Sequence, residues 1–590
     1  MAETLISPGV LARENDQSFV TAQPTVRGAA IIGPTTKGPV ERPTLISSFS
    51  SYQNIFGGAL ESGSAQYTYL TSIAANQYFQ NGGNSLLVTR VVSSSANWTA
   101  ATSSLIPTGS GGSGGGNVSP FVLETISQGE IMNSAGPTGS NASLLSGSSD
   151  NFRWEIASVN TSSGVFSLLI RRGDDTQSNK VILENFNNIS LDPFAPNFIT
   201  RAIGDVTTNV VTQDGTTFLQ ESGSHRNISS YVRVKQVNLA TPHYFNNDGS
   251  AKNQYTSSLP AVGSGSSQGV FASGVGSNIM AGGANNFYEA IGSQTQGLTG
   301  SDYDSAIALL ANADDYQYNV ASAPGLLHAA HSTQTTSLMN NAISRGDNIA
   351  VIDMVSYGSL IGAVTSQVAG IDNSYTSTYW PWLQTVDPNT GMLVYIPAST
   401  FIPGIYAFTD ASSDPWFAPA GITRGGMGQV VRAERKLTSA NRDSLYEANI
   451  NPIATFPNQG VVVFGQKTLQ KAATALDRIN VRRLLITLKD YISQIADNLV
   501  FEQNTIATRQ NFLTQVNPYL ENVQQRQGLY AFKVVMDESN NTPDVIDRNE
   551  LIGQLFLQPT KTAEFILLDF NVLPTGSSFK LGNLTSTLSI

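Results

Sequence analysis

The sequence predicts a multidomain chain of mixed α/β and α+β type, and three observations support this prediction. The chain has 590 residues, which is more than a single hydrophobic core usually holds. Apolar strands alternate with helices near the N-terminus and again after residue 301, as in an α/β fold. Between them lies a long β-like stretch broken by Gly- and Ser-rich segments, which indicates an insertion.

The N-terminal part is expected to contain an extended arm and then a β-α-β unit. The arm, residues 1–20, contains Pro8-Gly9 and could not bury itself alone. The elements expected after it are a strand at 26–33, a short strand and helix at 44–56 with Ser50 or Ser51 as the cap, a helix at 69–83 ended by Gly82-Gly83, and a buried strand at 85–92.

Residues 96–280 are expected to form a β-rich insertion in the α/β domain, which therefore comprises residues 21–95 and 281–440. Strands of the insertion are predicted at 152–159, 165–172 and 231–237, between Gly- and Ser-rich stretches at 93–150 and 257–284. The second part of the α/β domain is predicted to have helices at 302–312 and 335–346 and strands at 318–325 and 348–355.

Residues 441–572 are predicted to form a C-terminal α+β domain, followed by a polar arm at 573–590. Its expected elements are a strand at 460–465, helices at 481–500 and 504–527 with Pro518 interrupting the second, and strands at 529–537 and 563–572. The first helix has an apolar stripe that must pack on a core, made of Val481, Leu484, Leu485, Leu488, Tyr491, Ile492, Ile495 and Leu499.

Composition and charge argue against several functions. The net charge of -11 disfavours general nucleic-acid binding, which needs a basic surface. Without cysteine the chain has no disulfide, no thiolate metal site and no cysteine nucleophile. The N-terminus does not read as a signal peptide, and no apolar run approaches the length of a membrane span. Charged residues make up only 13%, which suits surfaces that meet other protein surfaces.

One stretch, Gly28 to Pro39, imitates a phosphate-binding loop. Gly28 and Gly33 have the spacing of such a loop, but Pro34 stands where its lysine belongs and Lys37 comes three residues late. Asp353 ends an apolar strand like the Mg²⁺-binding aspartate of an NTPase. Without a phosphate loop, we interpret it as a cap for the next loop, and the glycine stretch as a strand that enters a turn.

Other candidates for catalysis have weak contexts: the G-x-S-x-G match Gly265–Gly269, the pair His328 and His331, and the carboxylates Asp174-Asp175 and Asp314-Asp315. The first lies in a low-complexity segment and not between a strand and a helix. The histidines lack a third ligand and are interpreted as hydrogen-bonded polar residues. The carboxylates occupy turns and are interpreted as solvated or capping groups. We therefore predict no enzyme and no catalytic, cofactor-binding or metal site.

The helix at 481–500 begins with two cations, Arg482 and Arg483, and carries Lys489 further on, away from its apolar stripe. Cations at a helix N-terminus oppose the helix dipole by about 0.3–1 kcal/mol each. Two interpretations stay open: surface arginines paired with carboxylates such as Asp477, or contacts with an acidic surface of a partner.

Both ends of the chain alternate apolar and polar residues without a core of their own. They could be disordered tails, or arms that add strands to a neighbour's sheet. The residues expected to mediate such contacts between subunits are Ile6, Val10, Leu11, Phe565, Leu567, Phe570, Phe579 and Leu581.

Several long segments show a common resemblance and keep their order along the chain: residues 6–18, 27–58, 190–205, 227–235, 379–421, 479–492, 500–513 and 537–570. They resemble the sheath protein of contractile phage tails, most closely the T-even-like type. The stretches at 190–205 and 227–235 are similar to the T-even-like insertion. The Gly- and Ser-rich stretches at 93–150 and 257–280 carry no resemblance.

The resemblance implies a tail-sheath fold in which the C-terminal domain faces the tail tube and the insertion lies outermost. It also implies that subunits stack as hexameric rings in a helical polymer, which contracts without nucleotide and drives the tube through the host envelope. The implied partners are further copies of the chain, the tail tube protein, the baseplate, and terminator or neck proteins, with no direct contact to nucleic acid or membrane. Assembly in the host cytoplasm into a virion tail follows, without a cofactor, and Arg482, Arg483 and Lys489 become candidate contacts to the tube.

Three alternatives remain at this point. One is the sheath of a non-phage contractile injection system of bacteriocin or secretion type, although the T-even-like insertion favours a phage. Another is an α/β NTPase or hydrolase. The third is a static structural protein such as a tail tube or capsid subunit.

Overall fold

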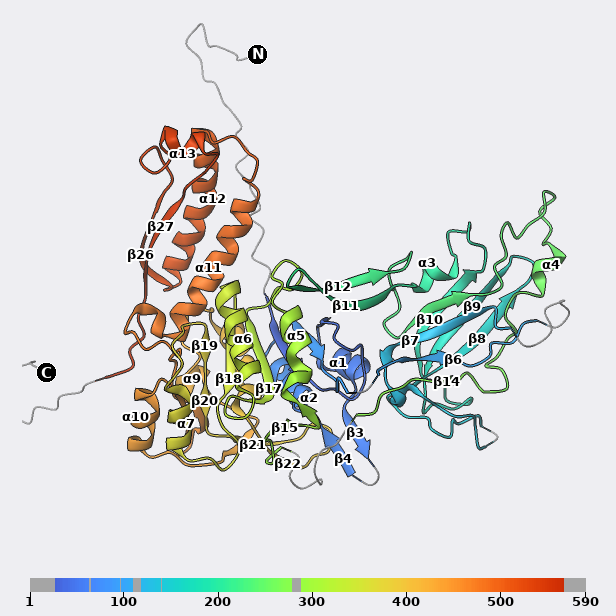
Figure 1. Ribbon diagram of the computed structural model, residues 1–590, viewed down its shortest axis with the longest axis horizontal. Helices are drawn as coiled ribbons and strands as arrows, with labels where there is room; N and C mark the ends of the chain where they lie inside the picture. Colours follow the sequence, from blue (N-terminus) through green and yellow to red (C-terminus); the bar gives the residue numbers. More distant parts are fainter. Residues whose placement is uncertain are drawn as a thin grey trace, which may run out of the picture.

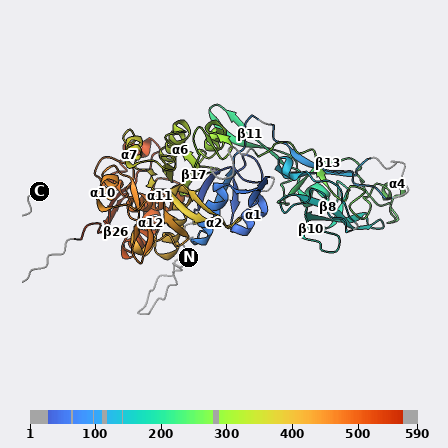
Figure 2. The same ribbon diagram turned by 90° about the horizontal axis from the view of Figure 1, so that it is seen from below.

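The computed structural model describes residues 27–62, 65–95, 97–109, 118–139, 141–278 and 288–566. The molecule is elongated and has three parts (Figure 1, Figure 2). An α/β core lies in the middle, a β-rich part lies at one end, and a helix pair with a small sheet rises from the other end. None of the helices in the described ranges is long and apolar enough to cross a membrane.

The core is built on a six-stranded sheet in the order β19-β18-β17-β1-β5-β2. The strands are β1 (Ala29–Gly33), β2 (Thr44–Ile46), β5 (Leu86–Arg90), β17 (Val320–Leu327), β18 (Ile349–Asp353) and β19 (Thr376–Ser377). All neighbours are parallel except β2, which is antiparallel to β5. Because β1 pairs with β17, segments almost 300 positions apart in the chain share one sheet.

Helices cover both faces of this sheet, because successive strand residues point to opposite sides. Ala29 and Ile31 join one hydrophobic cluster, whereas Ala30 and Ile32 join another. The first cluster includes α2 (Leu70–Gln80) and α8 (Ile402–Ser412), and the second includes α5 (Asp304–Leu309), α6 (Ser332–Arg345), α7 (Ile361–Val368) and α10 (Ser439–Glu447). The core is thus a three-layer α/β/α arrangement.

The predicted elements of the core are confirmed, with one correction. The helix α1 (Phe49–Phe56) is capped by Ser48, whose hydroxyl accepts a hydrogen bond from the backbone N–H of Ser51 at 3.2 Å. The expected cap at Ser50 or Ser51 is wrong because both residues already lie inside the helix. After α2 the chain reverses through Gly82, whose φ of 90° suits glycine.

Shorter elements complete the core. A three-stranded sheet contains β20 (Tyr379–Trp380), β24 (Asn451–Phe456) and β25 (Gly460–Val463). A second one contains β21 (Leu383–Val386), β22 (Leu393–Ile396) and β23 (Val430–Ala433). The rest are the hairpins β3 (Ala59–Ser62) with β4 (Ala65–Thr68) and β15 (Gln294–Thr295) with β16 (Leu298–Thr299), the helix α9 (Gly421–Arg424), and the 3₁₀ turns η3 (Gly300–Tyr303), η4 (Ala398–Thr400) and η5 (Ala475–Asp477).

The β-rich part spans the residues predicted as an insertion and has a hydrophobic cluster of its own, which includes Trp154, Phe121 and Phe166. One sheet is β13 (Val232–Val237), β7 (Phe121–Gln128), β6 (Ala100–Ser103) and β14 (Phe271–Ala272). Another is β10 (Ile182–Ser190), β9 (Val165–Arg172) and β8 (Phe152–Asn160). The ribbon β11 (Thr207–Gln213) with β12 (Thr216–Ser222), the helices α3 (Ile199–Ile203) and α4 (Asn253–Thr256), and η1 (Glu130–Met132) complete it. The three strands predicted here are confirmed.

The C-terminal part packs two long helices, α11 (Ile479–Asp497) and α12 (Ile506–Gln525), against β26 (Leu529–Val535) and β27 (Gln554–Pro559). The helix α13 (Pro543–Asp547) lies between the strands in sequence. Two expectations are wrong here. Pro518 lies inside a continuous α12. Residues 563–566 form no strand, and the partner of β26 is β27 instead. The remainder of the expected strand, 567–572, lies outside the described residues.

Candidate assembly surfaces

The turn after β1 binds its own chain and leaves no phosphate cradle. Lys37 is buried, lies 3.5 Å from Asp150 of the insertion, and donates to the backbone oxygen of Ser149 at 3.4 Å. Burial lowers the pKa of Lys37, and the nearby Asp150 partly offsets this effect. A lysine held in this way joins the core to the insertion.

A second buried cation strengthens the same junction. The guanidinium of Arg90, at the end of β5, donates to the backbone oxygen of Gly38 at 2.6 Å and of Gln128 at 2.9 Å. It also lies over the ring of Trp98, 5.0 Å from the ring centroid. Burial lowers the pKa of Arg90 to about 10, so the side chain still carries its charge at neutral pH. The insertion is therefore attached through a desolvated, hydrogen-bonded seam.

The remaining catalytic candidates are also occupied by structural contacts. Asp353 is fully buried and accepts hydrogen bonds from the backbone N–H and the hydroxyl of Ser399 in η4, which agrees with a capping role. His331 accepts from the N–H of Leu327 at 3.2 Å, and His328 pairs with Thr335 at 2.8 Å. The residues 265–269 form a turn, without the strand and helix that a nucleophile elbow needs.

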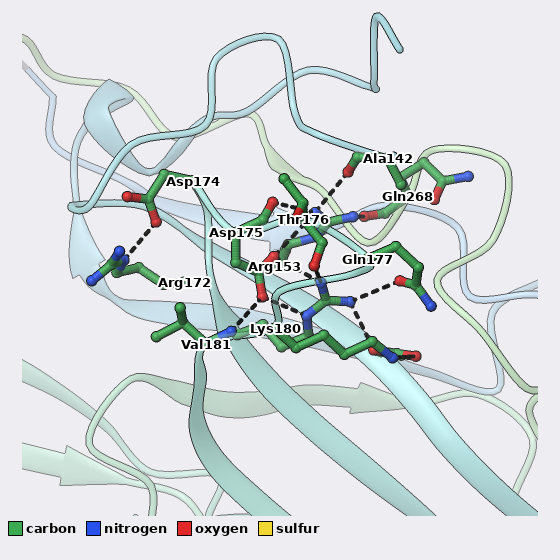
Figure 3. A network of polar contacts seen from close by, with 12 residues as sticks. Ala142, Arg153, Arg172, Asp174, Asp175, Thr176, Gln177, Lys180, Val181 and Gln268 are labelled. Atoms are coloured by element: carbon green, nitrogen blue, oxygen red, sulfur yellow. Dashed lines mark hydrogen bonds and ion pairs between the residues drawn. The ribbon is translucent and has the colours of Figure 1, made fainter. Parts of the chain in front are cut away.

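The acidic pair in the insertion differs from its expectation. Asp174 is half-exposed and pairs with Arg172, but the Asp175 side chain is completely buried. Asp175 contacts the side chains of Arg171 and Arg153, and Figure 3 shows it beside Arg153. Arg171 donates to both of its carboxylate oxygens, at 2.7 and 2.8 Å, and Arg153 donates at 3.2 Å. The expectation of a solvated group is wrong for Asp175, because long-range packing buries this turn.

This cluster has no free acid or base for catalysis. Glu155 accepts from Arg171 at 2.7 Å and from Lys180 at 2.8 Å. Arg153 also donates to the backbone oxygens of Ala142 and Gln268 (Figure 3). Each charged group of the cluster contacts at least one group of opposite charge, as a folded interior requires. No group of three potential metal ligands occurs within the part of the chain that the structure describes.

The arginines of α11 lie inside the molecule. Arg482 is 4% exposed, donates to the backbone oxygen of Ser374 at 3.2 Å, and stacks over the ring of Tyr375. Arg483 is also 4% exposed and contacts both carboxylate oxygens of Asp410 at 2.6 Å. The expectation that these arginines lie on an outer face of the helix is wrong, because the core closes over the first turns of α11.

Lys489 is the exposed cation of the three candidates. Its ammonium group donates a hydrogen bond to the Tyr375 hydroxyl at 3.4 Å, and the residue is exposed. A contact between this helix and a tube stays a prediction. Asp477, the carboxylate expected to pair with the two arginines, instead pairs with Arg478, one residue before α11.

Each end of the described chain is held by ion pairs. Arg27 binds Asp490 of α11 and lies 3.5 Å from Asp347, so the segment entering β1 is tied to both the core and the helix pair. Glu564 accepts from Tyr446 at 2.6 Å and from Arg478 at 2.8 Å. Burial and the nearby Glu564 carboxylate raise the pKa of Tyr446, which keeps its hydroxyl a donor. Both ends of the described range are thus fixed by ion pairs, and each set of contacts is called a clamp below.

Residues 565 and 566, the last two that the structure describes, are exposed. Phe565 is 85% exposed and makes no strand. The other residues expected in contacts between subunits, Ile6, Val10, Leu11, Leu567, Phe570, Phe579 and Leu581, lie outside the described residues.

The sheet formed by β26 and β27 is a further candidate assembly surface. Its strand β26 was predicted from the sequence, but β27 was not. Phe532 and Leu557, directly opposite each other, pack on the helix pair, while Tyr530 and Phe556 are exposed. Among the described residues each strand has a single neighbour. A two-stranded sheet is marginal by itself and its open edges can accept further strands. The alternation in "QLFLQP" was the signal that could have revealed β27.

Comparison with known families places two adjoining matches on this chain. Residues 296–469 match the phage tail sheath protein central domain, and residues 471–572 match the phage tail sheath C-terminal domain.

Individual relatives agree with these matches. The tail sheath protein of Vibrio phage KVP40 is 40% identical over 216 residues, which cover 37% of this chain and 31% of that protein. The tail sheath protein of Enterobacteria phage T4 is 34% identical over 230 residues, covering 39% and 35%. The chain thus spans about a third of the length of these two relatives. In fold, it is similar to a sheath tail protein from Listeria innocua, with a TM-score of 0.50, 11% identity, and 91% and 96% of the two chains covered.

Proposed function

We propose that this chain belongs to the phage tail sheath family and is the subunit of a contractile tail sheath. The observation that carries the proposal is the pair of family matches, which follow one another without a break of more than one residue from 296 to 572. Members of this family are structural proteins, and the chain is not an enzyme.

In the proposed assembly, subunits form hexameric rings that stack helically around a tail tube. The sheath is built in an extended state and shortens when the baseplate signals, driving the tube through the host envelope. The work comes from the difference in packing free energy between two states of the polymer. A tail tube protein, a baseplate and terminator or neck proteins are the proposed partners, and assembly takes place in the host cytoplasm.

The two clamps and the β26–β27 sheet support a specific form of subunit contact. We propose that the chain ends beyond Arg27 and Glu564 add strands to the open edges of this sheet in neighbouring subunits. Such strand addition satisfies backbone hydrogen bonds across the interface without requiring a large apolar patch. Clamps at the two points of departure would transmit tension from an arm into the folded body.

Deletion of either chain end tests this proposal. Purified full-length protein should form long, hollow, striated cylinders in electron micrographs. Deleting residues 1–16 or residues 575–590 should leave folded, soluble monomers that no longer polymerise, because the neighbouring sheets lose their added strands. A deletion variant that polymerises like the full chain contradicts arm exchange. Full-length protein that stays monomeric under every condition contradicts the sheath function itself.

A further inference from the structure

A cleft of about 1740 Å³ separates the core from the C-terminal helix pair. Its core side includes Tyr78 and Tyr406, and its helix side includes Tyr491 and Tyr519, whose rings stack with centroids 3.7 Å apart. Arg27 also lines the cleft. Because neighbouring Cα atoms are 3.8 Å apart, the residues preceding Arg27 must begin at this cleft.

The walls of the cleft are rich in side-chain amides. The helices α11 and α12 contribute Gln494, Gln510, Asn511, Gln515 and Asn522, and Asn498 follows directly after α11. An amide side chain both donates and accepts hydrogen bonds. An extended polypeptide needs this combination, because each of its residues presents an N–H and a C=O that must be satisfied when buried.

Three carboxylates of the cleft already have cationic partners in this chain. Asp410 pairs with Arg483 at 2.6 Å and Asp414 pairs with Arg526 at 2.6 Å. Asp490 pairs with Arg27. With these charges neutralised, the exposed Glu521 is the one further acidic residue of the lining. The chemistry of the cleft therefore favours an extended peptide without acidic residues and with some apolar side chains over an ion or a highly charged ligand.

The sequence immediately before Arg27 has this chemistry. Residues 17–26, "QSFVTAQPTV", carry no charge and include an aromatic residue, two valines and a proline, whereas residues 3–16 contain four charged side chains. Ten extended residues reach about 33–36 Å. The 20-residue helix α12 is about 30 Å long, so the segment can follow its whole length.

We propose that residues 17–26 dock in this cleft of their own chain. Attachment at Arg27 holds the segment at a high effective concentration, so modest contacts are enough to seat it. One consequence of this docking rests on the proposed function. Residues 1–16 form the part of the arm that exchanges between subunits, and tension on them is transmitted to α11 and α12 as well as to β1.

The absence of cysteine makes the proposal testable by crosslinking in the full chain. One variant combines Thr21→Cys with Gln515→Cys on the cleft wall. The matched control combines Thr21→Cys with Gln525→Cys, a glutamine on the same helix that does not line the cleft. Monomers isolated by size-exclusion chromatography are treated with a short bismaleimide, and the linked peptides are identified by mass spectrometry.

Docking predicts intramolecular crosslinks at position 515 on the order of tenfold more abundant than at position 525, because the seated segment stays near the wall. Equal yields at the two positions overturn the proposal. Crosslinks found only between two copies also overturn it, and assign the cleft to the segment of a neighbour. Gln510→Cys is a second wall position if the first variant does not give folded monomers.

The crosslinking result can be distinguished from the test of the proposed sheath function. Crosslinking is measured on monomers, whereas sheath formation is scored by cylinders in electron micrographs of uncrosslinked protein. Cylinders without the monomer crosslink would contradict docking alone, and the crosslink without cylinders would contradict only the sheath.

Discussion

Several buried charges in this protein are neutralised by charged partners within the same chain. Asp175 shows this most fully, since its side chain is completely buried and contacts Arg171 and Arg153. Taking such groups out of water costs several kcal/mol per ion, which is recovered only if the pairing is complete. The structure therefore depends on each member of the cluster being present.

We expect Asp175→Asn to destabilise the β-rich part by about 3–5 kcal/mol, because it leaves buried arginine charge uncompensated. The neighbouring Asp174→Asn is the matched control. It removes only a half-exposed pair with Arg172 and should cost about 0–1 kcal/mol. Thermal unfolding followed by circular dichroism measures both. Similar shifts for the two variants would show that the buried cluster does not have this role.

The carboxyl group of Asp353 makes stability depend on pH. Burial raises its pKa to about 6, from an ordinary value of 3.8. The folded state thus binds a proton more readily than the unfolded state, so this contribution is complete at low pH and is lost as the pH rises through about 6.

Asp353→Asn should remove this dependence, since the amide stays neutral. Between about pH 5 and about pH 8 the wild-type protein should lose on the order of 1 kcal/mol more stability than the variant. Unfolding midpoints of both proteins across this range provide the measurement. A difference between them that does not change with pH would contradict the shifted pKa.

The helix α11 connects the C-terminal part to the core through buried cations. Arg482 and Arg483 reach into the core, and Asp490 further along α11 receives Arg27 from the segment before β1. These contacts lie on both sides of the apolar stripe, so the helix is enclosed on more than one face. The carboxylate of Asp410 offsets the unfavourable position of Arg483 near the positive end of the helix dipole.

Arg483→Glu should destabilise the protein by about 3–5 kcal/mol, because it places a buried carboxylate against Asp410. Lys489→Glu, on the exposed side of the same helix, should change stability by no more than about 0.5 kcal/mol. Chemical unfolding of the two variants tests this contrast. If both variants are equally stable, the inward position of Arg483 is wrong.

Because its stability is expected to be preserved, the Lys489→Glu protein is the informative variant for a tube contact. Impaired assembly on purified tubes, with tube-free polymers still formed, would support such a contact. Normal extended tails would contradict it. An assembly defect in an Arg483 variant would report only on folding.

For the molecule as a whole, separate hydrophobic clusters predict parts that fold independently. The β-rich part has its own cluster, and its two ends meet where Thr99 pairs with Val275. We expect residues 97–278 to fold alone with one cooperative thermal transition. In this fragment, the surface that faces the core lacks its contacts with Lys37 and Arg90, which belong to the core. Water hydrates this surface instead.

A shorter fragment, residues 118–260, is the control for this expectation. It lacks β6 and β14, which pair with each other, and β6 also borders β7. It should therefore unfold at a lower temperature. A fragment 97–278 that stays unfolded would contradict independent folding and the expected domain limits, which otherwise remain a prediction.

Elements with a strong local pattern could be predicted from the sequence. The apolar strands around Ile31 and Val351 and the stripe of α11 were predicted because spacing along a segment encodes which side is buried. The cap of α1 was missed by a few residues, because several serines in a row offer equivalent hydroxyls and only the start of the helix selects Ser48. The short strand β27 was missed because its alternation is weak and its partner lies about 25 positions away.

The sequence by itself determined the local elements, the lack of a consistent catalytic motif and the resemblance to sheath proteins, all of which depend on residue type, order and spacing. Only the tertiary structure decided which polar groups are buried. Arg482, Arg483, Lys37 and Asp175 look like surface residues in the sequence, yet each is enclosed by segments distant along the chain. Burial depends on the simultaneous approach of several elements, and the spacing of residues within one element carries no record of that approach.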